Sequence, residues 1–168
     1  INTNYDGAYS FGEMVTGGDY VIRPYLNEDW LNGVSTADIV RIQKHILGVD
    51  PFTSPFEWLA ADVNKDGRVS SQDISLVRKL ILGTVTEVKG NTSYRFIPEN
   101  YTFKDLEFPL NDDVEEVIQT DYLTTDFKAN FTSIKVGDVS GALGNVNTST
   151  LTRNRYYSIG TMDAILSD

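Results

Sequence analysis

A repeated segment near the middle of the chain constrains its fold more than any other feature. The stretch GVSTADIVRIQKHILG, residues 33–48, aligns with RVSSQDISLVRKLILG, residues 68–83, at an offset of 35 residues, and eight of the sixteen positions are identical. Apolar residues recur every three or four positions in both copies, which predicts an amphipathic helix in each. The predicted apolar faces contain Ile39, Ile42 and Ile46 in the first copy and Ile74, Val77 and Ile81 in the second.

Helix start and stop signals support this interpretation. Each predicted helix is preceded by the pattern Ser-x-x-Asp, which is typical of a capping box, and is followed by glycine, which is favoured just after a helix. These residues are Ser35 with Asp38, Ser70 with Asp73, Gly48 and Gly83. Between the copies, the stretch Ser54-Pro55-Phe56-Glu57 predicts a further short helix that continues through Ala60. Each copy is therefore expected to be a loop followed by a helix.

The loop before the second helix has the composition of a calcium site. Ca²⁺ binds six to eight oxygen atoms at about 2.3–2.6 Å, and the twelve residues DVNKDGRVSSQD place oxygen-bearing residues at alternate positions. Glycine at the sixth position permits the sharp turn, and the pattern departs from the EF-hand formula only at the last position, where Asp replaces Glu. The alternative is an Asx-rich turn without metal. The predicted ligands are Asp62, Asn64, Asp66, the backbone carbonyl of Arg68, Ser70 directly or through water, and Asp73.

The loop before the first helix is a degenerate version of the second. Its fifth position is a leucine, and Asn32 stands where glycine is expected, as the next best residue for a left-handed turn. With two carboxylates instead of three, we expect either weaker calcium binding or a purely structural turn. The predicted oxygen donors are Asn27, Asp29, a backbone carbonyl near Leu31 or Gly33, and Asp38.

Composition narrows the possible partners. The net charge is −10, which disfavours nucleic acid and favours cations. The chain has no cysteine, so it forms no disulfide, and it has no run of about 18 apolar residues that would form a membrane-spanning helix. It begins at Ile1 with neither methionine nor a signal-peptide pattern, so we expect a processed chain or part of a longer one.

The chain divides into four predicted segments of an α+β fold. Residues 1–24 are expected to form strands around Tyr9–Phe11 and Tyr20–Ile22, ending at Pro24, as the end of a β-sandwich-like domain. Residues 25–85 hold the calcium-loop–helix repeats. Residues 86–141 are expected to be a β-rich extension, with a solvated acidic stretch at 112–116, and residues 142–168 a tail or a linker to a neighbour.

The stretch DVNKDGRVSSQDISLVRKLILG closely resembles the repeat of type I dockerin modules. The resemblance implies two tandem calcium loops, an extracellular location and docking onto cohesin domains. The further stretches NTSYRFIPENYTF and IKVGDVSG resemble a longer unit of large secreted bacterial surface proteins, commonly preceded by a carboxypeptidase-regulatory-like β domain. By resemblance, the partner-binding positions are Ser71, Gln72, Arg78 and Lys79 in the second repeat and Thr36, Ala37, Gln43 and Lys44 in the first.

Two functions follow as expectations. The first is a calcium-stabilised structural module of a bacterial surface protein or fibre, which holds neighbouring domains or subunits together and could assemble with its own copies. The alternative is a dockerin that anchors a secreted, polysaccharide-degrading enzyme to a cohesin-like scaffold. We expect no catalytic residues in either case, and His45 is expected to be a half-buried helical residue. A calcium sensor is disfavoured because the chain has only two methionines.

Overall fold

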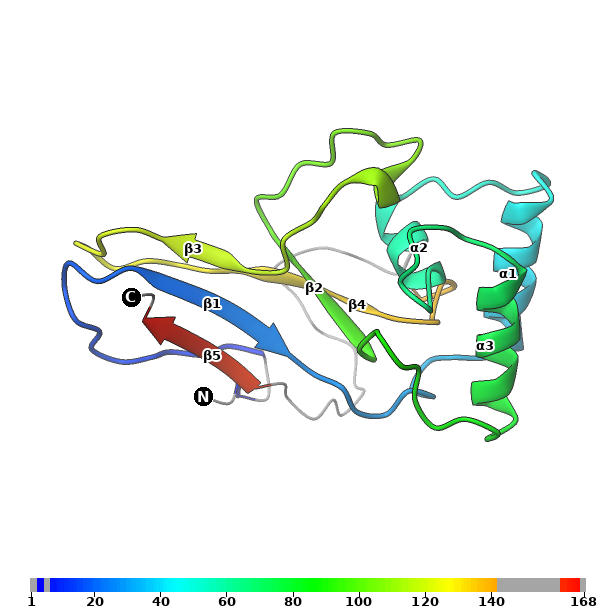
Figure 1. Ribbon diagram of the computed structural model, residues 1–168, viewed down its shortest axis with the longest axis horizontal. Helices are drawn as coiled ribbons and strands as arrows, with labels where there is room; N and C mark the ends of the chain where they lie inside the picture. Colours follow the sequence, from blue (N-terminus) through cyan, green and yellow to red (C-terminus); the bar gives the residue numbers. More distant parts are fainter. Residues whose placement is uncertain (1–2, 5–6, 142–160, 167–168) are drawn as a thin grey trace.

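The computed structural model describes residues 3–4, 7–141 and 161–166. Most of the predicted tail, 142–168, lies outside these residues. The molecule is elongated: the helices gather at one end, a three-stranded sheet forms the other end, and a two-stranded sheet lies between them (Figure 1). It is a mixed α+β fold, as the sequence predicts.

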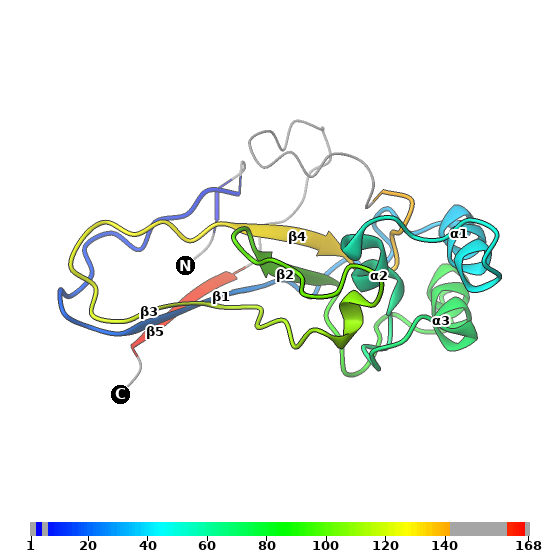
Figure 2. The same ribbon diagram turned by 90° about the horizontal axis from the view of Figure 1, so that it is seen from above.

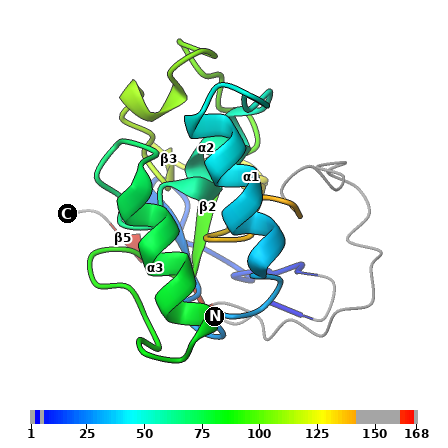
Figure 3. The ribbon, with the colours of Figure 1, turned by 90° about the vertical axis from the view of Figure 1, so that its right-hand side faces the viewer.

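The three predicted helices are confirmed. They are α1 (Thr36–Ile46), α2 (Pro55–Ala61) and α3 (Ser71–Ile81). Each begins with a full capping box, in which a serine accepts from the helix backbone and an acidic side chain accepts from the serine N–H. Helices α1 and α3 lie side by side at the end of the molecule, with α2 behind them (Figure 3).

The strands form two small antiparallel sheets. Strand β1 (Tyr20–Tyr25) lies between β3 (Ile118–Thr120) and β5 (Thr161–Leu166), so that Ile22 is opposite both Ile118 and Ala164. Strand β2 (Tyr94–Pro98) pairs with β4 (Phe131–Lys135). A 3-10 turn, η1 (Pro109–Asn111), lies beside α2. Figure 2 shows the β2–β4 pair between the helices and the three-stranded sheet.

One hydrophobic core joins the helices to the β2–β4 pair. Ile42 of α1 and Val77 of α3 are fully buried, and they share this core with Ile97 of β2 and Ile134 of β4. A backbone hydrogen bond also joins α2 to the segment after β4, since the N–H of Gly137 donates to the carbonyl of Ala60 at 2.8 Å. The loop–helix region therefore packs as one unit with the extension that follows it.

Several local expectations were wrong. Residues 9–11 form no strand, and the Tyr9 hydroxyl instead donates to the backbone carbonyl of Ala129. Pro24 does not end its strand, because the ladder with β5 continues to Tyr25. Ile46, the last residue of α1, is exposed and does not share the burial of Ile42.

The acidic stretch at 112–116 is solvated only in part: Asp113 and Glu115 are exposed, as predicted, whereas Asp112 and Glu116 bind other residues. Asp112 accepts hydrogen bonds from the Tyr101 hydroxyl and the Lys104 N–H. Glu116 forms ion pairs with Lys65 at 3.1 Å and with Arg95 at 2.9 Å. Asp112 therefore stabilises the extension internally, and Glu116 connects it to β2 and the second loop.

Candidate calcium centre and docking face

The second loop joins α2 to α3 and its ends are fixed by both helices. Asp62 is the residue that follows α2, and Asp73 is in the first turn of α3. Two residues of the loop, Lys65 and Gly67, have left-handed backbone conformations with φ of 57° and 82°. Glycine adopts this conformation without steric cost, so Gly67 permits the tight turn that the sequence predicts at this position.

Carboxylates of the loop accept hydrogen bonds from its own backbone. The two oxygens of Asp62 accept from the N–H groups of Asp66 and Gly67, each at 3.0 Å. Asp73 reaches back across the loop, where its Oδ1 accepts from the N–H of Val63 at 2.9 Å. The backbone thus curves around Asp62 and Asp73. Each oxygen of Asp62 accepts one hydrogen bond and keeps a further lone pair for a cation, whereas Asp73 accepts from Val63, Asn64 and Ser70.

Two of these carboxylates are buried without a compensating positive charge. Asp62 is 1% exposed and Asp73 is 0% exposed, and neither forms an ion pair with any residue that the structure describes. Burial raises the pKa of both, against the lowering effect of their backbone hydrogen bonds, and the neighbouring acids raise the pKa further. A buried anion requires a partner charge, so the loop fits a bound cation.

The donor set fits calcium by its chemistry. No three acidic or histidine side chains of the described residues gather into a metal cluster, so the carboxylates alone do not form a complete site. The predicted set adds the side chains of Asn64 and Ser70 and the carbonyl of Arg68, all oxygen donors within the same twelve residues. Ca²⁺ prefers such mixed, flexible oxygen sets.

The first loop has a different backbone path. Its left-handed residues are Asp29 and Gly33, with φ of 47° and 77°, so Asn32 does not take the left-handed position that we predicted. The carbonyl of Leu31 accepts from the N–H of Val34 within a local turn at 3.0 Å. Left-handed residues fall at positions three and seven, and not at four and six, so this loop does not repeat the shape of the second.

Other segments occupy several oxygens of the first loop. Asn27 Oδ1 accepts from the N–H of Ser93, and Asp38 Oδ1 accepts from the N–H of Ser140 at 2.8 Å. The carbonyl of Trp30 accepts from the ammonium of Lys135 at 3.0 Å. The first loop is therefore a junction with the β-rich extension.

We expect Gly33→Ala to destabilise the protein more than Gly48→Ala. Both glycines are left-handed, which costs alanine about 1–2 kcal/mol. A Cβ on Gly33 would lie 2.2 Å from Oδ2 of Asp138, whereas a Cβ on Gly48 meets nothing within 4 Å. Gly33→Ala must also displace Asp138, and urea denaturation measures the difference. Equal losses of stability would contradict the close approach.

The eight predicted partner-binding residues are all exposed. Four lie within α1 and four within α3, whereas Asp38 and Asp73 of the same helices are buried. The residues are Thr36, Ala37, Gln43, Lys44, Ser71, Gln72, Arg78 and Lys79. This set is called the α1–α3 face below. Because α1 and α3 pack against each other, both groups of four lie at the helical end of the molecule (Figure 3).

His45 is half-buried, as predicted. Its Nδ1 accepts from the N–H of Phe52 at 3.0 Å, and its ring stacks on the Phe52 ring with centroids 3.8 Å apart. Burial and the nearby Arg41 lower the pKa of His45, with Glu57 opposing them. These contacts give the imidazole a packing role in the junction between α1 and α2.

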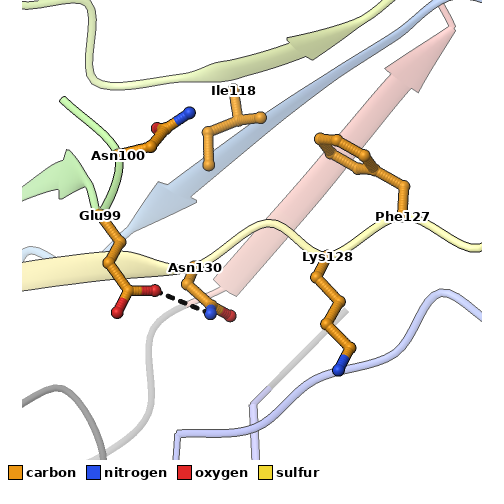
Figure 4. A pocket seen from close by; sticks show the side chains of 6 residues that line it. All are labelled: Glu99, Asn100, Ile118, Phe127, Lys128 and Asn130. Carbon is orange, nitrogen blue, oxygen red and sulfur yellow. Dashed lines mark hydrogen bonds between the residues drawn. The ribbon is translucent and has the colours of Figure 1, made fainter.

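A surface pocket lies at the far ends of β2 and β4, away from both loops (Figure 4). Across it Asn130 donates to Glu99 at 2.8 Å. None of the predicted metal or partner residues lines it. The lining residues are Glu99, Asn100, Ile118, Phe127, Lys128 and Asn130.

Sequence reasoning missed four residues that complete this region. Asn91 donates to the carbonyl of Val63 in the second loop, and Glu116 pairs with Lys65 of the same loop. Lys135 and Asp138 lie against the first loop. All four fall in stretches that the sequence analysis names: NTSYRFIPENYTF begins at Asn91, the acidic stretch ends at Glu116, and IKVGDVSG contains Lys135 and Asp138. The sequence did not indicate that these stretches contact the two loops.

Residues 26–82 match the family model of the dockerin type I domain. No curated protein and no solved structure matches the chain. The match covers both loops and all three α-helices, and it leaves the strands outside. Type I dockerin domains are non-catalytic modules of secreted or cell-surface proteins that bind calcium and mediate protein–protein interaction, typically with cohesin domains. In the described residues, no helix is both long and apolar enough to cross a bilayer.

Proposed function

We propose that this chain is an extracellular, calcium-stabilised interaction module, in which the second loop binds Ca²⁺ and the α1–α3 face binds a cohesin-like protein domain. The buried, uncompensated carboxylates Asp62 and Asp73 carry the first part of the proposal. The dockerin match supports the second part. The ligands would be Asp62, Asn64, Asp66, Asp73, Ser70 and the carbonyl of Arg68.

Calcium and docking are coupled through α3 in this proposal. Asp73 is both a proposed ligand and the capping residue of α3, where it accepts from the Ser70 N–H at 2.8 Å. A cation at Asp73 would fix the start of α3, on which Arg78 and Lys79 are displayed. Removing calcium should therefore weaken partner binding without any direct contact between the ion and the partner.

The α1–α3 face is tested by reversing two of its charges. We expect the double variant Arg78→Glu, Lys79→Glu to lose binding to an immobilised cohesin domain in surface plasmon resonance, because both side chains are exposed on that face. Calcium affinity and melting temperature should stay close to those of the wild type. The alternative role of both residues, a favourable interaction with the helix dipole, contributes only about 0.3–1 kcal/mol.

A matched control changes the same charge elsewhere. Lys104 and Lys128 are exposed in the extension, so Lys104→Glu, Lys128→Glu should bind the cohesin domain normally. Undiminished binding by the Arg78, Lys79 double variant would remove the α1–α3 face from the proposal.

The second candidate function is a structural module that joins neighbouring domains or copies of the chain in a surface fibre. The observation that favours it is the core shared by the helices and the β2–β4 pair, which makes the loop–helix region part of a larger body. Analytical gel filtration separates the candidates. Self-assembly in calcium, without a cohesin domain, would favour the fibre module, and a monomer that binds cohesin would favour docking.

A further inference from the structure

A half-buried lysine lies against the first loop. The ammonium of Lys135, the last residue of β4, donates to the backbone carbonyls of Trp30 and Val136, each at 3.0 Å. The same nitrogen lies 5.7 Å from the centroid of the Trp30 ring and 5.3 Å from that of Tyr94. Carbonyl oxygens and aromatic faces together form the kind of surroundings that hold a cation.

Three carboxylates act on the same ammonium. Burial lowers the pKa of Lys135 to about 8, and the negative charges of Asp138, Asp29 and Asp38 oppose this lowering. The side chain therefore stays mainly protonated at neutral pH. Asp29 and Asp38 are two of the oxygen donors that the sequence assigned to a calcium ion in this loop.

The two loops thus meet their charge requirement differently. In the second loop the buried acids have no ion-pair partner among the described residues. In the first loop the ammonium of Lys135 donates to the carbonyl of Trp30 and acts electrostatically on Asp29 and Asp38, although it forms no ion pair with either. A calcium ion in the first loop would be repelled by this ammonium at close range. Oxygens of Asn27 and Asp38 moreover accept hydrogen bonds from residues outside the first loop, Ser93 and Ser140, whereas Asp62 and Asp73 accept from the backbone of their own loop.

We propose that the Lys135 ammonium is the resident cation of the first loop, so that this loop holds no calcium and the chain binds one calcium ion, in the second loop. The proposal rests on the proposed function only for the second-loop site. It assigns Lys135 a positioning role: the residue fixes the first loop to β4 at any calcium concentration. Calcium removal would then loosen the second loop while the first stays attached.

The first test counts bound ions by isothermal titration calorimetry with CaCl₂. We expect one calcium ion per wild-type chain, weaker binding by Asp66→Asn at an exposed ligand position, and unchanged binding by Asp29→Asn. Asparagine suits the left-handed backbone at position 29, where φ is 47°. Two ions in the wild type, one of them lost in Asp29→Asn, would overturn the proposal.

The second test measures melting temperatures in saturating calcium. Lys135→Met keeps the apolar stem of the side chain but removes the positive charge that balances the carboxylates. We therefore expect its melting temperature to be lower than that of the wild type by roughly 5–10 °C. Lys128→Met, at an exposed position before β4, is the control and should melt as the wild type. Introduced into the wild type, Asp29→Asn should lower the melting temperature. Introduced into Lys135→Met, it should raise the melting temperature again in part, because it removes one uncompensated negative charge.

The outcomes are distinguishable. Partial rescue by Asp29→Asn, or a second calcium ion bound by Lys135→Met alone, supports the proposal, since either shows that the ammonium was balancing these acids. A Lys135→Met variant that melts as the wild type and still binds one ion overturns it. A wild type that binds no calcium would refute the proposed second-loop site, and the melting comparison would still decide the role of Lys135.

Discussion

Removing calcium from the wild-type chain is expected to lower its free energy of unfolding by about 2.7 kcal/mol when the ion had been present at 100 times its dissociation constant. The physical reason is that Asp62 and Asp73 are buried with no positive partner among the described residues. The cysteine-free chain also has no disulfide to hold the loop in the apo state. Thermal melting in CaCl₂ and in a chelator measures the change.

Magnesium at the same ionic strength is the control for this experiment. Mg²⁺ dehydrates reluctantly and demands a stricter octahedral geometry, so it should restore much less of the stability than calcium does. Equal melting temperatures in calcium and in chelator would refute the second-loop site.

Arg41→Met is expected to destabilise the protein by about 3–5 kcal/mol, even with calcium bound. The guanidinium of Arg41 pairs with Glu57 at 2.6 Å, and the Glu57 carboxylate is fully buried. Removing the arginine leaves that carboxylate without its counter-ion. The N–H groups of Thr53 and Ser54 still donate to Glu57, which places the expected loss toward the lower end of the range. Urea denaturation gives the value.

Lys44→Met on the same helix is the matched control, because Lys44 is exposed and its loss should change stability by no more than about 0.5 kcal/mol. Adding Glu57→Gln to Arg41→Met should recover part of the loss, since the buried charge is then removed. Similar losses for Arg41→Met and Lys44→Met would show that the pair contributes little.

Local signals in the sequence determined the helices and the second loop. Apolar periodicity and the Ser-x-x-Asp pattern define α1 and α3, and Ser54-Pro55-Phe56-Glu57 defines α2, because capping and amphipathicity depend on residues within one or two helical turns. The turn at Gly67 is equally local. The exposure of Arg78 and Lys79 follows from the helical periodicity of α3.

The strands were harder to predict, because their pairing joins distant parts of the chain. Strand β1 pairs with β3 nearly a hundred residues later and with β5 beyond it, and Pro24 remains inside the strand. A short alternating pattern around Tyr9 gave the same signal as Tyr20–Ile22, although only the second forms a strand. Periodicity cannot separate the two, since the difference lies in which segment finds a partner.

The two loops differ partly in features that the sequence determines and partly in contacts that only the tertiary structure creates. The sequence determined that the second loop has three carboxylates and a glycine at the turn, and that the first is poorer in oxygen donors. Only the tertiary structure brought Lys135 to the carbonyl of Trp30 and Glu116 to Lys65. The first of these pairs is separated by 105 residues and the second by 51. A buried charge is balanced by the groups that the folded chain places beside it. The spacing of residues within the loop does not indicate which groups these are.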